Sequence, residues 1–435
     1  MKTSLFQTIL LGVFGLGALI GLFVFATYTS NGGGDNTIGT VVIWGTLPSA
    51  GIQSTLSITA QTNTDLKNVS YVQKDPETLL SDIATAIATD AAPDIILASQ
   101  EELRALTKFI TLIPLSTLSA NTFTSTFVEE GRMFTAQDGT GYYGIPFLVD
   151  PLVLFSNRTI LSSSGIAKPP ATWEALIGLV PSVALLTPSR QITRGLIALG
   201  TYDNVHDARG ILSALFLQQG IPISSYAANN LLTADLGGTS SGTASLGSAV
   251  LGFYTQFTDP SKVSYTWNTS LPDSEQMFLA GDLALYLGYA SRARYLQDAN
   301  PNLNFTVTPL PQSALAKDKS TYGLVYAFMI PRGAKNPSGA YQAAALLTNA
   351  TEQSLAAQAT GLAPATLSEL ANIPSSDPTA AVAYAAALYS KGWLSPLPSD
   401  VNRIFSGMIG DVISGRSTLD VVLENAARSL SSLLQ

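Results

Sequence analysis

Two short apolar segments flank a helix-like segment soon after residue 40, and this order leaves few possible folds. Residues 41–45 (VVIWG) and 94–97 (DIIL) have the length and composition of buried strands. Leu79, Ile83 and Ile87 recur between them at helical spacing. A strand, a helix and a strand joined by short connections predict a parallel sheet with right-handed crossovers. We therefore expect the first half of the chain to be α/β.

Helical patterns are more frequent in the second half, at 340–360, 379–391 and 417–434. In the last of these, apolar residues including Leu433 form one stripe, and Ser417 with Asp420 has the spacing of a capping box. The chain has 435 residues, of which 46% are apolar and 12% charged. The part of the chain after residue 40 is larger than one hydrophobic core usually supports, so we expect it to form two lobes.

The carboxyl ends of the predicted strands indicate where a ligand would bind. In an open α/β sheet, ligands bind beyond these ends. Residues 44–46 (WGT) and 98–100 (ASQ) follow the two strands directly. We therefore expect both segments to line a common site.

The charged and reactive side chains exclude several classes of function. The 22 basic and 30 acidic residues give a net charge of −8, without a basic cluster that could bind nucleic acid. The chain has no Cys and a single His, which excludes zinc fingers, thiol catalysis and iron–sulfur clusters. We expect no catalytic residue, metal site or cofactor. His206, beside Asp207, is expected to be a solvated loop residue.

The amino-terminal segment predicts a membrane anchor. Residues 9–28 form an apolar, uncharged run that is long enough to span a bilayer as one helix. Lys2 precedes this run and Asp35 follows it, which places the amino end in the cytoplasm and the rest outside the cell membrane. We expect a cytoplasmic stub at 1–8, a transmembrane helix at 9–28 and a Gly-rich flexible linker at 29–40.

A cleaved signal peptide is the alternative interpretation of this segment. Val24, Phe25 and Ala26 would satisfy the small-residue rule before a cut. The apolar run is longer than a signal peptide requires, and no polar region separates it from this candidate cut. The uncleaved anchor is therefore favoured.

Eight short segments follow one another in an order typical of one protein family. They are 41–45 (VVIWG), 92–96 (APDII), 143–147 (YGIPF), 154–158 (LFSNR), 169–176 (PPATWEAL), 278–284 (FLAGDLA), 308–311 (TPLP) and 414–420 (SGRSTLD). With these segments the chain resembles the extracellular solute-binding proteins of ABC importers, in the branch that includes maltodextrin-binding proteins. Unlike lipid-anchored members, this chain has no Cys that could be acylated.

The resemblance implies a two-lobed, periplasmic-binding-protein-like (type II) α/β fold in which a hinge closes over the solute. By analogy, the chain crosses between lobes near 149–151, 287–289 and 332–335. Lobe 1 would comprise 41–150 and 289–335, and lobe 2 would comprise 151–288 and 336–435. The implied partners are a small-molecule solute, preferably a sugar or oligosaccharide, and the permease subunits of an ABC importer. We expect a monomer.

Aromatic residues are candidates for stacking on a sugar ring, whose C–H faces are apolar. Trp44 lies at a strand end, Tyr289 lies at the implied second crossing, and Trp393 follows an Ala-rich helix. Each of these has the alternative of packing in the core. Trp173, at a helix start, is expected to be structural, and Trp267 could pack beneath a loop.

Polar candidates for hydrogen bonds to sugar hydroxyls are Gln100 and Glu101, after the second strand, and Asp150, at the first crossing. The alternative for each is an ordinary solvated loop residue. Arg292 could face the cleft, but it could equally form an ion pair at the surface or between the lobes.

Two other functions stay open. One is a membrane-anchored receptor or adhesion module with the same fold and no transport role. The other is a secreted hydrolase, because residues 238–242 (GTSSG) match the G-x-S-x-G nucleophile pattern. The motif lies in a Gly- and Ser-rich stretch and not between a strand and a helix, so the hydrolase is disfavoured.

Overall fold

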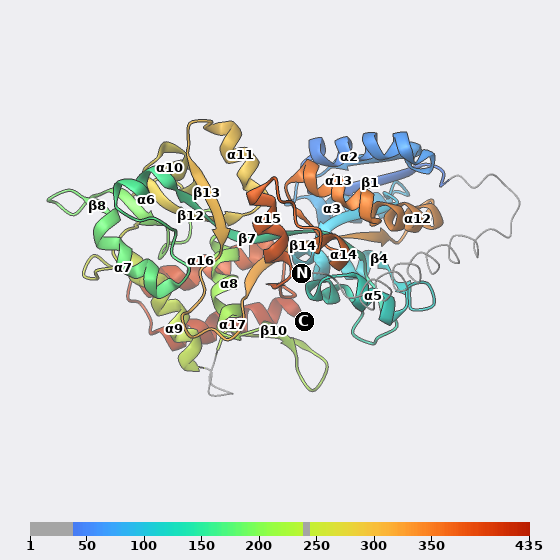
Figure 1. Cartoon of the computed structure of the whole chain (residues 1–435). Helices are drawn as coiled ribbons and strands as arrows, with labels where there is room; N and C mark the ends of the chain where they lie inside the picture. The colour runs from blue at the N-terminus through green and yellow to red at the C-terminus, as the bar shows by residue number, and fades with distance from the viewer. Residues whose placement is uncertain (1–37, 238–243) are drawn as a thin grey trace, which may run out of the picture.

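One mixed sheet runs through the described part of the molecule, and helices pack around it in two lobes (Figure 1). The computed structural model describes residues 38–237 and 244–435. The predicted anchor at 9–28 and the G-x-S-x-G pattern at 238–242 lie outside these ranges. Within them, no helix is both long and apolar enough to cross a bilayer.

The path of the sheet is β2-β1-β3-β14-β7-β12-β9-β8. In that order these strands are β2 (Val69–Gln73), β1 (Val41–Gly45), β3 (Ile95–Ser99), β14 (Thr321–Pro331), β7 (Ile145–Asn157), β12 (Leu283–Tyr289), β9 (Ile192–Ile197) and β8 (Leu185–Leu186). Short strands join its sides: β13 (Phe305–Pro309) and β15 (Ala363–Pro364) pair with β7, while β4 (Ile110–Thr111) and β16 (Ser390–Lys391) pair with β14.

The first three strands confirm the predicted parallel α/β unit. β1 is parallel to β2 and to β3, and α3 (Leu79–Ala88) buries Leu79 and Ile83 as their spacing predicts. The sequence interpretation missed α2 (Ser49–Thr62) and β2, which lie between β1 and α3. The buried face of α2 includes Thr55 and Thr59, whose hydroxyls donate to carbonyls of the preceding turn. A helix that buries threonines in this way has no apolar periodicity to reveal it.

Two lobes are visible in Figure 1, joined where β7 and β14 pass between them. We use lobe 1 for residues 38–150 and 324–370, and lobe 2 for the described residues of 151–323 and 371–435. The helices of lobe 1 are α2, α3, α4 (Gln100–Leu106), α5 (Ala120–Thr126), α12 (Pro337–Leu347), α13 (Ala350–Thr360) and α14 (Leu367–Leu370). Those of lobe 2 are α6 (Arg158–Ser163), α7 (Trp173–Val183), α8 (Ala208–Gln218), α9 (Ala244–Thr255), α10 (Ser274–Ala280), α11 (Arg292–Ala299), α15 (Pro378–Ala387), α16 (Pro398–Ile413) and α17 (Leu419–Leu434).

This grouping differs from the boundaries that the resemblance implied. β13 lies within 289–335 but pairs with residues 153–157 of β7, in lobe 2. α12 and α13 lie within 336–435 but pack on β1 and α2, in lobe 1. The chain returns to lobe 1 inside β14, whose residues 323–328 pair with the first half of β7. An unbroken strand carries this crossing, so no Gly- or Pro-rich connection marks it in the sequence.

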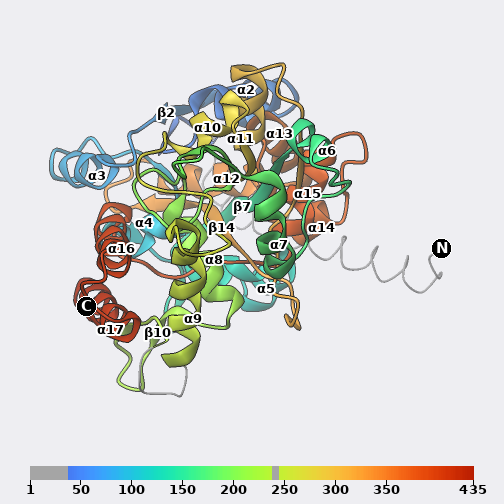
Figure 2. The same cartoon turned by 90° about the vertical axis from the view of Figure 1, so that its left-hand side faces the viewer.

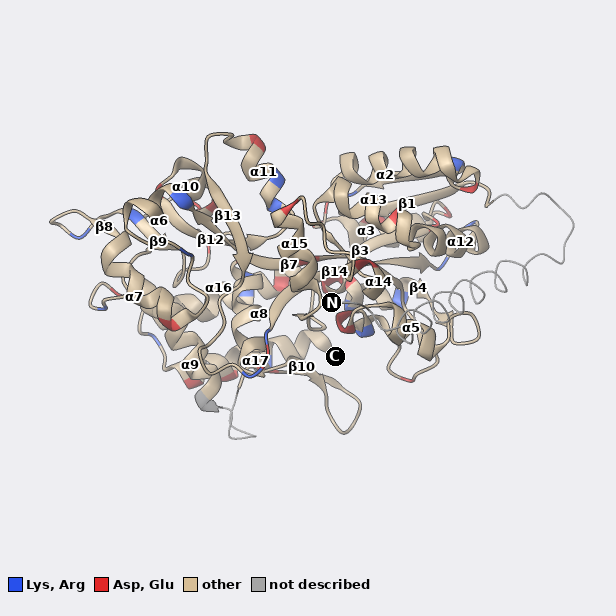
Figure 3. Ribbon diagram, viewed as in Figure 1, with Lys and Arg blue, Asp and Glu red and all other residues tan. Residues whose placement is uncertain are grey.

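The carboxy-terminal helices cover one side of lobe 2, where α16 and α17 lie next to each other (Figure 2). α17 buries most of the predicted stripe, but Leu433 is exposed and Leu434 is buried in its place. The predicted capping box does not form, because Thr418 is the N-cap and the Asp420 carboxylate accepts from the Ser248 hydroxyl. Charged residues are sparse along the described ribbon, and both signs are scattered over the two lobes (Figure 3).

Candidate functional site

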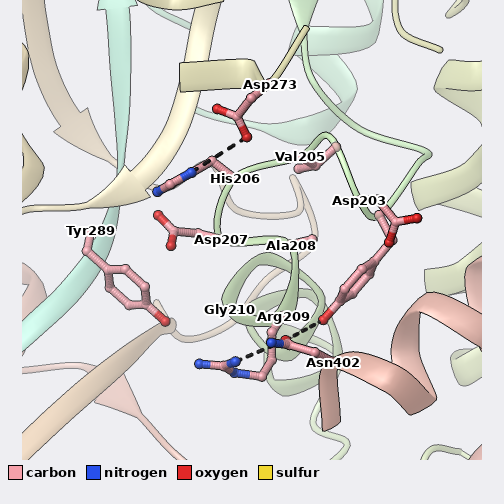
Figure 4. Close-up of a pocket in the computed structure, with 11 residues that line it drawn as sticks. Asp203, Val205, His206, Asp207, Ala208, Arg209, Gly210, Asp273, Tyr289 and Asn402 are labelled. Atoms are coloured by element: carbon pink, nitrogen blue, oxygen red, sulfur yellow. Dashed lines mark hydrogen bonds and ion pairs between the residues drawn. The ribbon is translucent and has the colours of Figure 1, made fainter. Parts of the chain in front are cut away.

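A cavity of about 450 Å³ opens where β9 and β12 of lobe 2 end. Its residues come mainly from the segment 202–210, between β9 and α8, with Tyr289 at the end of β12. Asp273, before α10, and Asn402, in α16, complete the lining (Figure 4). The cavity therefore lies beyond the carboxyl ends of two parallel strands, where an open sheet binds its ligand.

The segment between β9 and α8 is held rigidly. Tyr254 donates its hydroxyl to the Thr201 carbonyl at 2.6 Å, and Asn204 donates its amide to the carbonyls of Asn268 and Leu271. Trp267 is fully buried and donates its indole N–H to Asn204 Oδ1, so it packs beneath this loop. The backbone that carries the lining residues is thus ordered before any ligand binds.

Asp207 combines several unfavourable features at the cavity. It adopts left-handed backbone angles, with φ 56° and ψ 23°, and it precedes α8 without capping that helix. Its Oδ2 atom is buried and has no hydrogen-bond partner within the described chain. Burial raises the pKa of its carboxyl above the ordinary value. Such combined costs occur mainly at functional sites.

His206 points toward Asp273 and lies next to Asp207 (Figure 4). Its Nδ1 atom is 3.6 Å from Asp273 Oδ2, and its Nε2 atom is 3.8 Å from Glu275 Oε2. The hydrogen bond to Asp273 raises the pKa of the His206 imidazole, which its burial opposes. The expectation of a solvated loop histidine is therefore wrong, because the residue lines the cavity and is held by two carboxylates.

Arg209 joins the two lobes at the edge of the cavity. Its Nε and Nη2 atoms donate to the two carboxylate oxygens of Glu101 in lobe 1, at 3.0 and 2.6 Å. Its Nη1 atom donates to Asn402 Oδ1, which also accepts from the Tyr202 hydroxyl. Tyr322, at the start of β14, donates its hydroxyl to Glu101 Oε1 at 2.6 Å. Glu101 is buried, so the alternative of an ordinary solvated loop residue does not hold for it.

Asp150 and Tyr289 are both buried; Tyr289 lines the cavity, whereas Asp150 is not a lining residue but lies close enough to Asp207 for their charges to interact. Asp150 accepts the backbone N–H of Ser291 at 3.0 Å and the Ser291 hydroxyl at 2.5 Å. Burial raises the pKa of the Asp150 carboxyl to about 7, and the neighbouring charge of Asp207 adds to the rise. Tyr289 approaches α8 closely, because a Cβ added at Gly210 would lie 2.6 Å from its hydroxyl.

Gln100 and Arg292 are engaged elsewhere. The Gln100 amide donates to the Gly323 carbonyl at 2.9 Å and accepts the Val325 N–H at 2.7 Å. It therefore binds the backbone of β14 at the point where this strand passes from lobe 2 to lobe 1. Arg292 donates through Nε and Nη2 to both oxygens of Glu275, at 2.8 and 2.6 Å. Arg292 thus forms an ion pair, the alternative to facing the cleft, and both partners of this pair belong to lobe 2.

Neither of the two tryptophans expected at the cleft, Trp44 and Trp393, lines the cavity. Trp44 packs on the core of lobe 1, with Lys74 Nζ 3.8 Å from the centre of its ring. Trp393 is only 2% exposed and donates its indole N–H to the Ser213 hydroxyl of α8. Trp173, predicted to be structural, is buried and donates to Gln218 Oε1.

Of the ligand-binding candidates from the sequence, Tyr289 lines the cavity, and Glu101 is linked to it through Arg209. The lining residues that the sequence reasoning did not select include Tyr202, Asp203, Asp207, Arg209 and Asn402. The loop after β9 could have been found by the same rule that selected residues 98–100, because it also follows the carboxyl end of a strand. Asn402 has no such signal, since it lies in the middle of a helix far along the chain.

Comparisons with known proteins agree with this architecture. The profile of a family described as bacterial extracellular solute-binding proteins matches residues 58–386. No curated protein matches the chain by sequence.

Several solved structures have the same fold. One is a cyclic alpha-maltosyl-1,6-maltose binding protein from Arthrobacter globiformis, with a TM-score of 0.72 and 16% identity over 91% of this chain and 98% of that one. Another is the GacH receptor of Streptomyces glaucescens, whose structures include a complex with acarbose, with a TM-score of 0.67 and 15% identity over 91% and 98%. A maltotriose binding protein of Thermus thermophilus has a TM-score of 0.65 and 15% identity over 91% and 100%. The matched profile and the shared two-lobed fold show that the chain belongs to the family of bacterial extracellular solute-binding proteins.

Proposed function

We propose that this protein binds a carbohydrate in the cavity between β9, β12 and α8. The observation that carries the proposal is the arrangement at the strand ends, where a buried aromatic ring and several hydrogen-bonding side chains converge on one ordered loop. Sugars require this combination, because their rings present apolar C–H faces and a rim of hydroxyls. The complexes with acarbose and maltotriose among proteins of the same fold support the same solute class.

Each lining residue has a specific role in this proposal. Tyr289 stacks on the sugar ring. Asp207 and Asp150 accept hydrogen bonds from hydroxyls, and Asn402 and Arg209 complete the polar rim. Glu101 acts from lobe 1, through its ion pair with Arg209. Gln100, Arg292, Trp44 and Trp393 support the surrounding structure and do not touch the solute.

We further propose that the protein is held at the outer face of the cell membrane by residues 9–28 and delivers its solute to an ABC importer. Closure of the lobes around β7 and β14 would enclose the solute. Mass spectrometry of protein from the membrane fraction tests the anchor: an amino terminus at Thr27 or later would contradict it. Stimulation of ATP hydrolysis by a permease complex, in the presence of both protein and solute, tests delivery.

Binding is tested by thermal-shift screening of the full-length protein in detergent against neutral and charged solutes, because binding to the folded state raises its stability. Calorimetry then compares the wild-type protein with Tyr289→Ala. Loss of a buried stacking ring removes about 1–3 kcal/mol, so the affinity is expected to fall about tenfold to a hundredfold. Tyr295→Ala is the matched control, because Tyr295 is exposed on α11 and stacks under Arg292. A folded Tyr289→Ala variant with unchanged affinity would contradict the assigned site.

A further inference from the structure

The cavity and its surroundings contain more negative charge than the chain itself balances. Two arginines and one histidine lie nearby, and each already faces a carboxylate. Arg209 forms a two-pronged ion pair with Glu101, Arg292 forms one with Glu275, and His206 faces Asp273. Asp203 is exposed and accepts the Ser406 hydroxyl, so solvent screens its charge.

Two further carboxyls have no cation of their own. Asp207 Oδ2 is buried without a hydrogen-bond partner in the described chain, and Asp150 is satisfied only by the neutral donors of Ser291. The charges of His206, Arg292 and Arg209 favour the ionised form of Asp207, whereas Glu275 opposes it. The charge of Asp207 raises the pKa of Asp150, whereas that of Arg292 lowers it. Ionised together and buried, this pair is costly unless a positive charge compensates it.

We infer that the solute is a carbohydrate that carries a protonated amine, and that its ammonium group binds against Asp207 with Asp150 next to it. This inference rests on the proposed function of the cavity. A neutral hydroxyl would satisfy one acceptor and leave the charge of the pair in place. An ammonium group brings three donors and the compensating charge. The left-handed backbone of Asp207 turns its carboxylate away from capping α8, which leaves it free for this ligand.

The test compares matched sugars that differ in one group. The probes are glucosamine with glucose, galactosamine with galactose, trehalosamine with trehalose, and the β-1,4-linked glucosamine disaccharide with cellobiose. Calorimetry on the full-length protein at pH 7 is expected to show at least one amine that binds about tenfold more tightly than its hydroxyl counterpart. This preference should weaken as salt increases, because the charges are partly screened.

The variant Asp207→Asn identifies the residue that recognises the amine. Asn tolerates left-handed backbone angles and retains the shape of the side chain, so the ratio of the amine affinity to the hydroxyl affinity should fall toward one. Asp298→Asn makes the same change in net charge on the exposed face of α11, and the ratio should persist there. Thermal unfolding of each variant confirms that it is folded.

The outcomes separate the two proposals. If neutral sugars bind and no amine binds more tightly than its counterpart, the amine assignment is wrong and the carbohydrate site stands. If an amine is preferred but Asp207→Asn retains the full ratio, the assignment of Asp207 is wrong. If no member of any pair binds at millimolar concentration, the proposed function falls together with this inference.

Discussion

The substitution Glu130→Gln should reverse its effect on stability between pH 5 and pH 8. Glu130 lies in the 3₁₀ turn Glu129–Phe134 of lobe 1, is 5% exposed, and both of its carboxylate oxygens lack a hydrogen-bond partner in the described chain. Its carboxyl packs against two glycines, since a Cβ added at Gly323 or Gly392 would lie within 2.9 Å of one of its oxygens. Nothing in this packing stabilises the ionised form.

The magnitude follows from the pKa. Burial raises the pKa of the Glu130 carboxyl from 4.5 to about 8. The unfolded chain therefore releases this proton near pH 4.5, whereas the folded chain holds it until near pH 8, and the free energy of unfolding falls as the pH rises through this window. At about 1.4 kcal/mol per pH unit, the loss reaches about 3 kcal/mol at pH 7 and about 4 kcal/mol at pH 8.

The Gln amide cannot ionise, so the variant lacks this loss. Its buried, unsatisfied NH₂ group costs about 1–3 kcal/mol at every pH. Glu130→Gln should thus be less stable than the wild-type protein at pH 5 and more stable at pH 8. Urea unfolding at both pH values measures this, with Glu129→Gln as the control, because Glu129 is the exposed neighbour. The buried acids Glu102 and Asp150 are present in every variant, so their effects cancel. An equal stability difference at pH 5 and pH 8 would refute the reasoning.

Three further substitutions have measurable outcomes. Trp393→Ala should lower the free energy of unfolding by about 3–5 kcal/mol, because it empties a buried site; a loss below about 1 kcal/mol in urea unfolding would show that Trp393 is not packed as described. Arg209→Met leaves Glu101 buried without its cation, so small-angle scattering of the solute-free protein should show a larger radius of gyration; an unchanged radius would mean that this ion pair does not hold the lobes together. Gly392→Ala places a Cβ 2.5 Å from Met133 Cε and 2.8 Å from Glu130 Oε1, and differential scanning calorimetry should show a lower melting temperature.

Local regularity decided which parts of the fold could be predicted from the sequence. β1, α3 and β3 were predicted because their apolar residues follow strand and helix periods, and α17 was predicted from its stripe. α2 was missed because threonines take core positions in it. The lobe membership of residues 289–323 and 336–370 differs from the implied boundaries, because the return crossing lies within β14.

The site candidates came from two different signals. Glu101 was chosen because it lies just after a predicted strand, and Tyr289 because the family resemblance implies a crossing there. The partner of Glu101 is Arg209, 108 residues away, and only the folded sheet brings the two together, because α4 and α8 both pack on β14. The sequence likewise shows that Trp393 follows a helix, but the hydroxyl of Ser213 that binds its indole lies on another element 180 residues away.

The two strands between the lobes make the connection elastic. β7 and β14 pass the boundary as continuous strands of 13 and 11 residues that are paired with each other there. A hydrogen-bonded ribbon bends and twists as a unit, so opening cannot be a free rotation at two or three loose residues. The connection is therefore elastic, because bending the two paired strands away from their relaxed geometry costs free energy that grows with the bend. A change in the angle between the lobes in either direction therefore has to bend both strands together, which confines lobe motion to small deformations of this paired ribbon.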